Sequence, residues 1–314
     1  MTAHGSASRG RWPRAGPFSD AGGVSIAERL AAEVAILAAG QARLVIAVDG
    51  PDAAGKTTLA MDVADRLPVP VIAIGVDRFH RPRADRYRRG ELSAEGYYRD
   101  SFDNEVISGQ CLAPFRAGAP MIRTAGFDFR TDNARADEAV VPTAAVLIFD
   151  GVFLLRPELA GFWDLAIYLR VSPETTLRRA LTRDLDLFGS PDEIRRRYRG
   201  RYLPGQALYR TEAAPEERAH IVIGNDDPSR PVVIAWRLPA RTVPRETGAP
   251  GQSGARITGE GRPIHPAGVM SADCRLSQAR SGQRPVARAG GCPQSQPATG
   301  GIGDDAARRF CRDH

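Results

Sequence analysis

The feature that most constrains this chain is a glycine-rich stretch directly after a short apolar run. Leu44–Val48 is apolar, GPDAAGKTT occupies residues 50–58, and an apolar pattern of helical period begins at Leu59. This order predicts a buried strand, a tight turn and a helix, the setting in which G-x-x-x-x-G-K-[ST] binds nucleotide phosphates. The alternative is a chance glycine-rich turn, and the context favours the phosphate-binding interpretation.

One residue of this stretch is the only lysine in a chain with 43 basic residues. The compact ammonium of Lys56 fits between the β- and γ-phosphates, where a planar guanidinium would displace backbone donors. The N–H groups of the loop and of the helix N-terminus add positive partial charge. We therefore expect the phosphates of ATP or GTP to bind Gly50, Pro51, Asp52, Ala53, Ala54, Gly55, Lys56, Thr57 and Thr58.

Two carboxylates follow other apolar runs. Asp150 ends the run that begins at Ala145, and with the Thr57 hydroxyl it would bind Mg²⁺. The alternative is a turn aspartate before Gly151. Asp77 follows Val71–Ile74 and is the candidate general base for an attacking hydroxyl, with an N-cap or turn role as the alternative.

Apolar runs alternate with helical patterns through the middle of the chain. Further β-branched runs lie at Leu165–Val171 and Ile221–Ile223, and helical patterns cover residues 24–37, 59–67 and the segment that Ser172 caps. Continuous apolar strands are typical of sheets buried on both faces. The fold class is therefore α/β, a parallel sheet of the P-loop NTPase type with helices on both faces.

Composition divides the chain into three parts. Residues 1–22 have little to bury, and residues 241–314 contain one aromatic residue and one leucine. We expect both ends to be disordered, or the second to be a non-native reading, and residues 23–240 to form the folded domain. The start lacks the apolar core of a signal peptide and no run is long enough to span a membrane, so we expect a cytoplasmic protein.

Other features exclude several function classes. The four cysteines fit neither a disulfide framework nor a zinc site. The guanine-reading N-K-x-D motif of switch GTPases is absent, because the one lysine belongs to the loop. Motor and helicase ATPases need a larger core, whereas small-molecule kinases fit residues 23–240. The net charge of +6 is scattered and does not demand nucleic acid.

Five segments, in order, resemble the uridine kinase family within the uridine kinase–phosphoribulokinase group: GPDAAGKTTLA, GVDRFHRP, YYRDSFDNEVI, the FDF at 127–129 and VLIFDGVFLLRPEL. RRALTRD and RYLPGQALY continue the resemblance, which covers about residues 40–235. It implies phosphorylation of a nucleoside 5′-hydroxyl by ATP or GTP, on a five-stranded parallel sheet with a mobile helical lid. A small-molecule acceptor would then be the partner, and a homo-oligomer is compatible with the sequence.

The resemblance also assigns residue roles. Asp77 is the general base, Lys56 and Arg183 act on the transferred phosphate, and Thr57 and Asp150 hold the metal, with Asp150 in place of the family's Glu. Phe127 stands where the family has Tyr, Asp132 where it has His, and its ribose-binding aspartate falls near Tyr97. The acceptor-binding residues that it implies are Asp100, Asp103, Phe127, Phe129, Asp132 and Arg179.

Three interpretations remain open for EIRRRYRGRYLPGQ at residues 193–206: a nucleic-acid surface, a solvated helix face, or a lid that closes over phosphate. Of these we expect nucleic acid least. Two alternatives to a uridine or cytidine kinase also remain: a kinase for another small alcohol, such as a sugar phosphate or a pantothenate-like acceptor, and a nucleotide-binding regulator without turnover.

Overall fold

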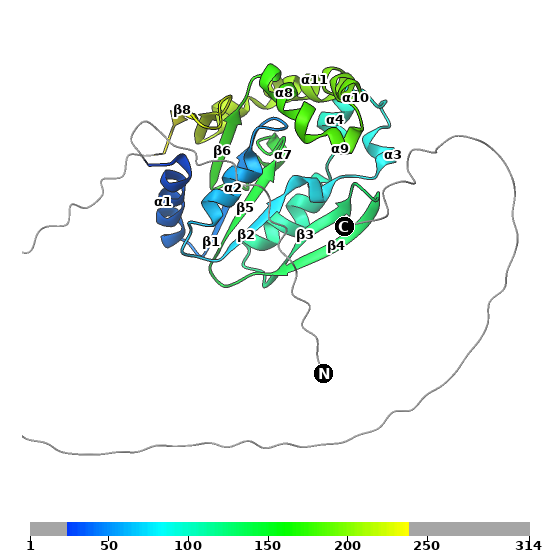
Figure 1. Cartoon of the computed structure of the whole chain (residues 1–314). Coiled ribbons are helices and arrows are strands. Elements are labelled where there is room, and N and C mark those ends of the chain that lie inside the picture. Colours follow the sequence, from blue (N-terminus) through cyan, green and yellow to red (C-terminus); the bar gives the residue numbers. More distant parts are fainter. Residues whose placement is uncertain (1–23, 239–314) are drawn as a thin grey trace, which may run out of the picture. The chain divides into compact units, whose positions relative to one another are not determined.

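The computed structural model describes residues 24–238, and the two ends predicted to be disordered lie outside them (Figure 1). The predicted domain, residues 23–240, therefore stays a prediction at its boundaries. Among the described residues, no helix is long and apolar enough to cross a membrane.

The central sheet has six strands in the order β2-β5-β1-β6-β7-β8. The first five in this order are parallel, and β8 pairs antiparallel with β7 at the edge. The strands are β1 (Arg43–Asp49), β2 (Val71–Gly75), β5 (Ala145–Gly151), β6 (Leu165–Arg170), β7 (Ile221–Gly224) and β8 (Val232–Trp236). Each of the five predicted strands is present, and the α/β class is confirmed. The resemblance implied five strands, but the sheet has a sixth, β8. The sequence analysis did not predict β8, whose Val232 and Ile234 are exposed.

Both faces of the sheet are buried, because alternate residues of each strand enter different clusters. Along β1, Leu44, Ile46 and Val48 pack in one apolar cluster, and Val45 and Ala47 in the other. The first cluster is covered by α1 (Ile26–Ala39) and α2 (Lys56–Ala64). The second is covered by aromatic side chains of α4 (Ala94–Asp100) and α11 (Leu203–Ala213), among others.

Sequence signals set the helix ends. Ser25 and Glu28 form a capping box that starts α1 two residues after the predicted start. The apolar spacing of α2 predicted a helix through Leu67, but α2 ends at Ala64. Leu67 still packs against the same cluster from the following turn.

The remaining helices lie around the sheet and the hairpin, and α8, α9 and α10 lie beside α11 (Figure 1). They are η1 (Val76–Phe79, a 3₁₀-helix), α3 (Arg83–Arg86), α5 (Asn104–Val106), α6 (Ala113–Arg116), α7 (Pro157–Ala160), α8 (Pro173–Arg183), α9 (Leu185–Phe188), α10 (Pro191–Arg197) and α12 (Pro215–Arg218). Two π-helical turns, η2 (Ile107–Leu112) and η3 (Tyr198–Tyr202), interrupt longer helices. A separate hairpin is formed by β3 (Met121–Asp128) and β4 (Asn133–Val140).

Candidate active site

The loop after β1 has backbone angles that require glycine. Gly50 has φ 153° and Gly55 has φ 92°. A Cβ on Gly50 would lie 2.7 Å from the carbonyl oxygen of Leu169, so the loop packs too closely on β6 for any other residue. Gly55 caps α2 without a side-chain hydrogen bond, which leaves the first N–H groups of the helix for an anion.

Lys56 lies at the centre of this loop. Its Nζ donates to the carbonyl oxygen of Pro51 at 2.6 Å, so the ammonium folds back over the loop. Burial lowers the pKa of Lys56, and the nearby charge of Asp52 opposes that shift. A partly desolvated ammonium among backbone donors is suited to a phosphate.

Thr57 and Asp150 meet at the predicted metal site. The Thr57 hydroxyl donates to the Asp150 carboxylate at 2.6 Å, although the two are 93 residues apart in sequence. Burial raises the pKa of Asp150, and the Thr57 hydrogen bond and the charge of Lys56 oppose the rise. Across residues 24–238 there is no group of three or more His, Cys, Asp or Glu that could hold a metal. The oxygen pair fits Mg²⁺, which is commonly bound by one or two protein oxygens together with phosphates and water.

Asp77 lies in η1, directly after β2, with its side chain 70 % exposed. Its charge contributes to the raised pKa of Asp150, after the larger effect of burial, so the two carboxylates lie near each other. The neighbouring His80 ring packs between Phe102 and Phe129, with ring centroids 4.5 and 4.9 Å away. Burial lowers the pKa of His80. The structure thus places the exposed Asp77 carboxylate next to a cluster of aromatic rings formed by His80, Phe102 and Phe129.

The other predicted acceptor-binding residues differ in accessibility. Phe127 is buried in the hairpin, whereas Asp103 caps α5 by accepting from the N–H of Val106 at 3.0 Å. Asp100 is buried and accepts from the guanidinium groups of Arg88 and Arg89 at 2.6 and 2.8 Å. Asp100 and Asp103 thus have structural partners of their own, and their contact with an acceptor stays a prediction.

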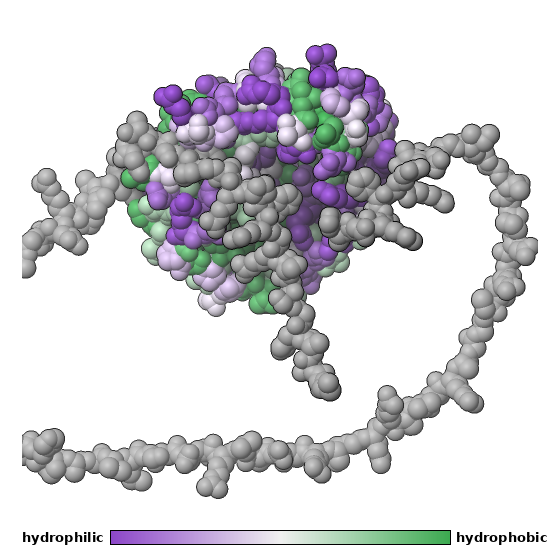
Figure 2. All heavy atoms as spheres, in the orientation of Figure 1, coloured by the Kyte–Doolittle hydropathy of each residue, from purple (hydrophilic) through white to green (hydrophobic). Residues whose placement is uncertain are grey.

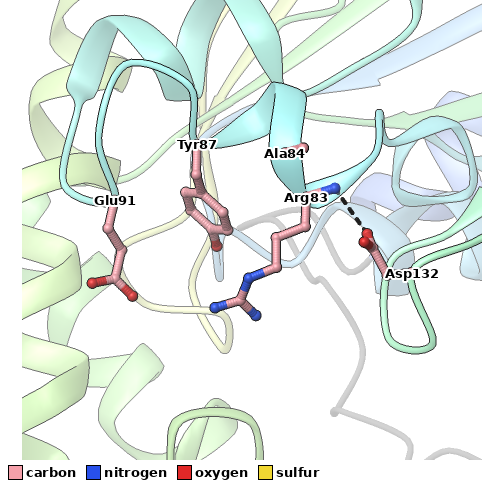
Figure 3. A pocket seen from close by; sticks show the side chains of 5 residues that line it. All are labelled: Arg83, Ala84, Tyr87, Glu91 and Asp132. Carbon is pink, nitrogen blue, oxygen red and sulfur yellow. Dashed lines mark hydrogen bonds between the residues drawn. The ribbon is translucent and has the colours of Figure 1, made fainter. Parts of the chain in front are cut away.

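Asp132 borders an open cavity of about 520 Å³ (Figure 3). From the β3–β4 turn its Oδ1 accepts from the backbone N–H of Arg83 at 2.8 Å, and from the guanidinium of Arg86 at 3.3 Å. Tyr87 and Glu91 line the other side of the cavity, as Figure 3 shows. Asp132 therefore faces the cavity as a carboxylate already anchored through one oxygen.

Arg179 and Arg183, to which the resemblance assigned roles in acceptor binding and phosphate transfer, occupy different positions. Arg179 of α8 donates to the carbonyl oxygen of Ala53 at 3.2 Å and to that of Asn225 at 2.6 Å, so it supports the phosphate loop from outside. Arg183 pairs with Asp184 at 2.6 Å. The charge of Arg183 also lowers the pKa of Lys56, after the larger effect of burial, so this guanidinium borders the site.

The arginine-rich segment at residues 193–206 forms most of α10, all of η3 and the start of α11, and this region is largely hydrophilic in Figure 2. Most of its arginines have internal partners. Arg196 and Arg197 pair with Glu91 and Glu193, and Arg201 is buried. These pairs favour a structural role over a nucleic-acid surface, because paired arginines contribute less to phosphate binding.

Sequence reasoning missed a buried carboxylate at the end of β1. Asp49 is fully buried and accepts from the N–H groups of Gly50 at 2.7 Å and Leu155 at 3.2 Å, and from the Tyr209 hydroxyl. Burial raises the pKa of Asp49 to about 6. The signal was an acidic residue at the end of an otherwise apolar run.

Two more residues escaped the sequence analysis. Asn225, just after β7, donates to the carbonyl oxygen of Ala54 at 2.7 Å and so holds the loop. Gln206 of α11 donates to the carboxylate of Asp52. Only the position of Asn225 after a predicted strand could have marked it, since parallel strands end at the ligand-binding edge.

Comparison with known proteins gives the same family as the motifs. The sequence model of the Phosphoribulokinase / Uridine kinase family matches residues 45–194. A uridine kinase of Halobacterium salinarum is 25% identical over 141 residues, and one of Chlamydia pneumoniae is 23% identical over 158 residues. These matches cover 45% and 49% of this chain, and 62% and 70% of the two relatives.

A solved structure supports the fold. A putative fructose transport system kinase from Silicibacter is 25% identical, with a TM-score of 0.52, and the match covers 61% of this chain and 96% of that one. Residues 45–194 are thus similar to the phosphoribulokinase/uridine kinase family, and the described chain has the fold of a P-loop kinase.

Proposed function

We propose that this protein transfers the γ-phosphate of ATP to a hydroxyl group of a small, nucleoside-like acceptor. The observation that carries the proposal is the pairing of Thr57 with Asp150 beside a glycine-fixed loop, with the exposed Asp77 directly after the neighbouring strand β2. A loop alone indicates nucleotide binding. A second carboxylate at a neighbouring strand end adds a group that can activate an attacking hydroxyl.

Each residue then has a chemical role. The backbone N–H groups of the loop and Lys56 bind and orient the phosphates, and Arg183 balances charge on the γ-phosphate. Asp77 accepts the proton of the acceptor hydroxyl as its oxygen bonds to the γ-phosphorus. The bond from that phosphorus to the bridging oxygen breaks, and ADP leaves. Mg²⁺, held by Thr57 and Asp150, would neutralise phosphate charge.

The acceptor class rests on separate observations. Phe129 and His80 offer a stacking surface next to Asp77, and the matched curated relatives are uridine kinases. Asp132 can accept from the amino group of cytosine, and its carboxylate oxygens repel the carbonyl oxygens of uracil. We therefore expect cytidine to be used at least as well as uridine.

A sugar is the second candidate acceptor. It is favoured by the similarity to the putative fructose transport system kinase. A sugar would need Asp77 and the phosphate loop, but not the aromatic surface at His80.

An acceptor screen tests the proposal. ADP formation is measured with cytidine, uridine, adenosine and ribose, with ATP or GTP as donor, for the wild type and for Lys56→Ala. We expect acceptor-stimulated turnover that Lys56→Ala abolishes while its melting temperature stays near that of the wild type. ATP binding without stimulation by any acceptor would instead identify a nucleotide-binding regulator.

A further inference from the structure

One acidic residue lies within the phosphate loop itself. Asp52 is the only carboxylate in GPDAAGKTT, and its charge opposes the anion that the loop otherwise attracts. A carboxylate two residues after Gly50 is therefore unfavourable for phosphate binding, which suggests that it interacts with a different ligand. The contacts of Asp52 indicate which ligand that is.

The Asp52 side chain is held by two buried donors. The Tyr97 hydroxyl of α4 donates to Oδ2 at 2.8 Å, and the Gln206 side-chain amide of α11 donates to the same oxygen. Tyr97 and Gln206 are 5% and 3% exposed. Within residues 24–238, no group donates to the other oxygen, Oδ1. The carboxylate is thus fixed in orientation with one oxygen left to accept.

Different elements hold Asp52 and the two residues that follow it in the loop. Arg179 and Asn225 hold the carbonyl groups of Ala53 and Ala54, from α8 and from the end of β7. Asp52 is held instead from α4 and α11, and its charge reaches the residues around Asp77. Burial lowers the pKa of His80, and the charges of Asp77 and Asp52 both oppose that shift.

We propose that Asp52 is a specificity-determining residue, whose free Oδ1 accepts a hydrogen bond from a second hydroxyl of the acceptor, next to the one that is phosphorylated. The acceptor class is then a neutral polyhydroxy compound, such as a ribonucleoside or a free sugar. An ionised carboxylate only accepts hydrogen bonds, so it selects hydroxyl donors and repels an anionic acceptor such as a sugar phosphate. This inference rests on the proposed kinase function.

The proposed hydrogen bond should discriminate between an acceptor and its analogue that lacks the second hydroxyl. A site built to bond a substrate hydroxyl rejects an analogue without it by about 10⁴, because the buried polar group is left unpaired. The half-open position of Asp52 reduces that penalty, so we expect a factor of about 10² for loss of the hydroxyl.

The experiment compares Asp52→Asn with the wild type, and with Asp65→Asn as a matched exposed control. For each protein, kcat/KM is measured for cytidine, 2′-deoxycytidine, 3′-deoxycytidine, ribose and 2-deoxyribose, together with KM for ATP. We expect the wild type and Asp65→Asn to prefer one complete acceptor over its deoxy analogue by about 10². In Asp52→Asn this ratio falls towards one, mainly through loss of the complete acceptor, and KM for ATP changes less than about threefold.

Tyr97→Phe is the second variant, because it removes one donor and keeps the carboxylate. It should raise KM for the complete acceptor and retain the preference over the deoxy analogue. A wild-type preference that persists in Asp52→Asn, with a raised KM for ATP, would overturn the inference and make Asp52 a support of the phosphate loop. If the wild type turns over no acceptor, the proposed function fails, and the inference fails with it.

Discussion

At the scale of single residues, the site combines charges that the sequence places far apart. The carboxyl ends of β1 and β5 bring Asp49 and Asp150 close to Lys56, and all three have pKa values shifted by burial. Groups of this kind cluster at functional sites, where low dielectric strengthens their interactions. Asp49 differs from the others because backbone and tyrosine donors enclose it completely.

Asp49 should make the stability of the protein depend on pH. Its pKa of about 6 in the folded protein exceeds the ordinary value of 3.8, so the folded state keeps a proton that the unfolded chain has released. The stabilisation is complete below the unfolded value and is lost as pH rises through about 6. Relative to Asp49→Asn, the wild type should lose roughly 2 kcal/mol of unfolding free energy between about pH 4 and pH 7.

Urea unfolding of both proteins at several pH values in this range measures the difference. Because every other titrating group is shared by the two proteins, the difference isolates Asp49. Parallel pH profiles would show that Asp49 titrates alike in the folded and unfolded chain.

The sequence predicted the local part of this site and not its long-range part. Lys56 and Thr57 belong to a contiguous motif whose backbone is fixed by glycines, so their roles can be read from spacing. The partners of Asp52 lie 45 and 154 residues away, and Tyr209 lies 160 residues from Asp49. No spacing rule connects residues at such separations, because the packing of α4 and α11 on the sheet brings them together.

At the scale of elements, strands with continuous apolar runs were predictable and the others were not. β4 is mostly exposed, and its only apolar residues before Val140 are alanines, so no continuous apolar run marks it. The π-helical turns depend on one residue inserted into a helix, and helical spacing does not reveal it. η3 lies between α10 and α11 and contains the buried Arg201.

Arg201 connects η3 with the segment that contains α3 and the start of α4. Its guanidinium donates to the carbonyl oxygens of Arg86 at 3.0 Å and Ser93 at 3.1 Å, and it lies over the Tyr87 ring. Arg201→Met would leave these buried acceptors unpaired, so we expect a loss of roughly 2–4 kcal/mol in unfolding free energy.

The matched control for Arg201 is Arg199→Met, two residues away and exposed, which should stay within about 0.5 kcal/mol of the wild type. Urea unfolding at neutral pH measures both variants. An equal, small effect of the two substitutions would mean that Arg201 contributes no more than a surface arginine.

At the scale of the whole described molecule, the sheet gathers the chemistry at one edge. The loop follows β1, Asp77 follows β2, and Asp150 ends β5, and these three strands are neighbours in the sheet. Ligands of open α/β sheets bind outside the carboxyl ends of the strands. The strand order thus explains why the phosphate loop, Asp77 and Asp150 lie together at one edge of the sheet.

The most direct test of phosphoryl transfer separates nucleotide binding from chemistry at Asp77. Binding of ATP with Mg²⁺ and transfer of labelled γ-phosphate to the best acceptor are measured for the wild type, Asp77→Asn and the control Asp65→Asn. We expect Asp77→Asn to bind ATP within about threefold of the wild type and its rate of phosphate transfer to fall by about 10² or more, with Asp65→Asn unchanged. A collapse of ATP affinity with a normal rate at saturation would contradict the role of Asp77 as the base.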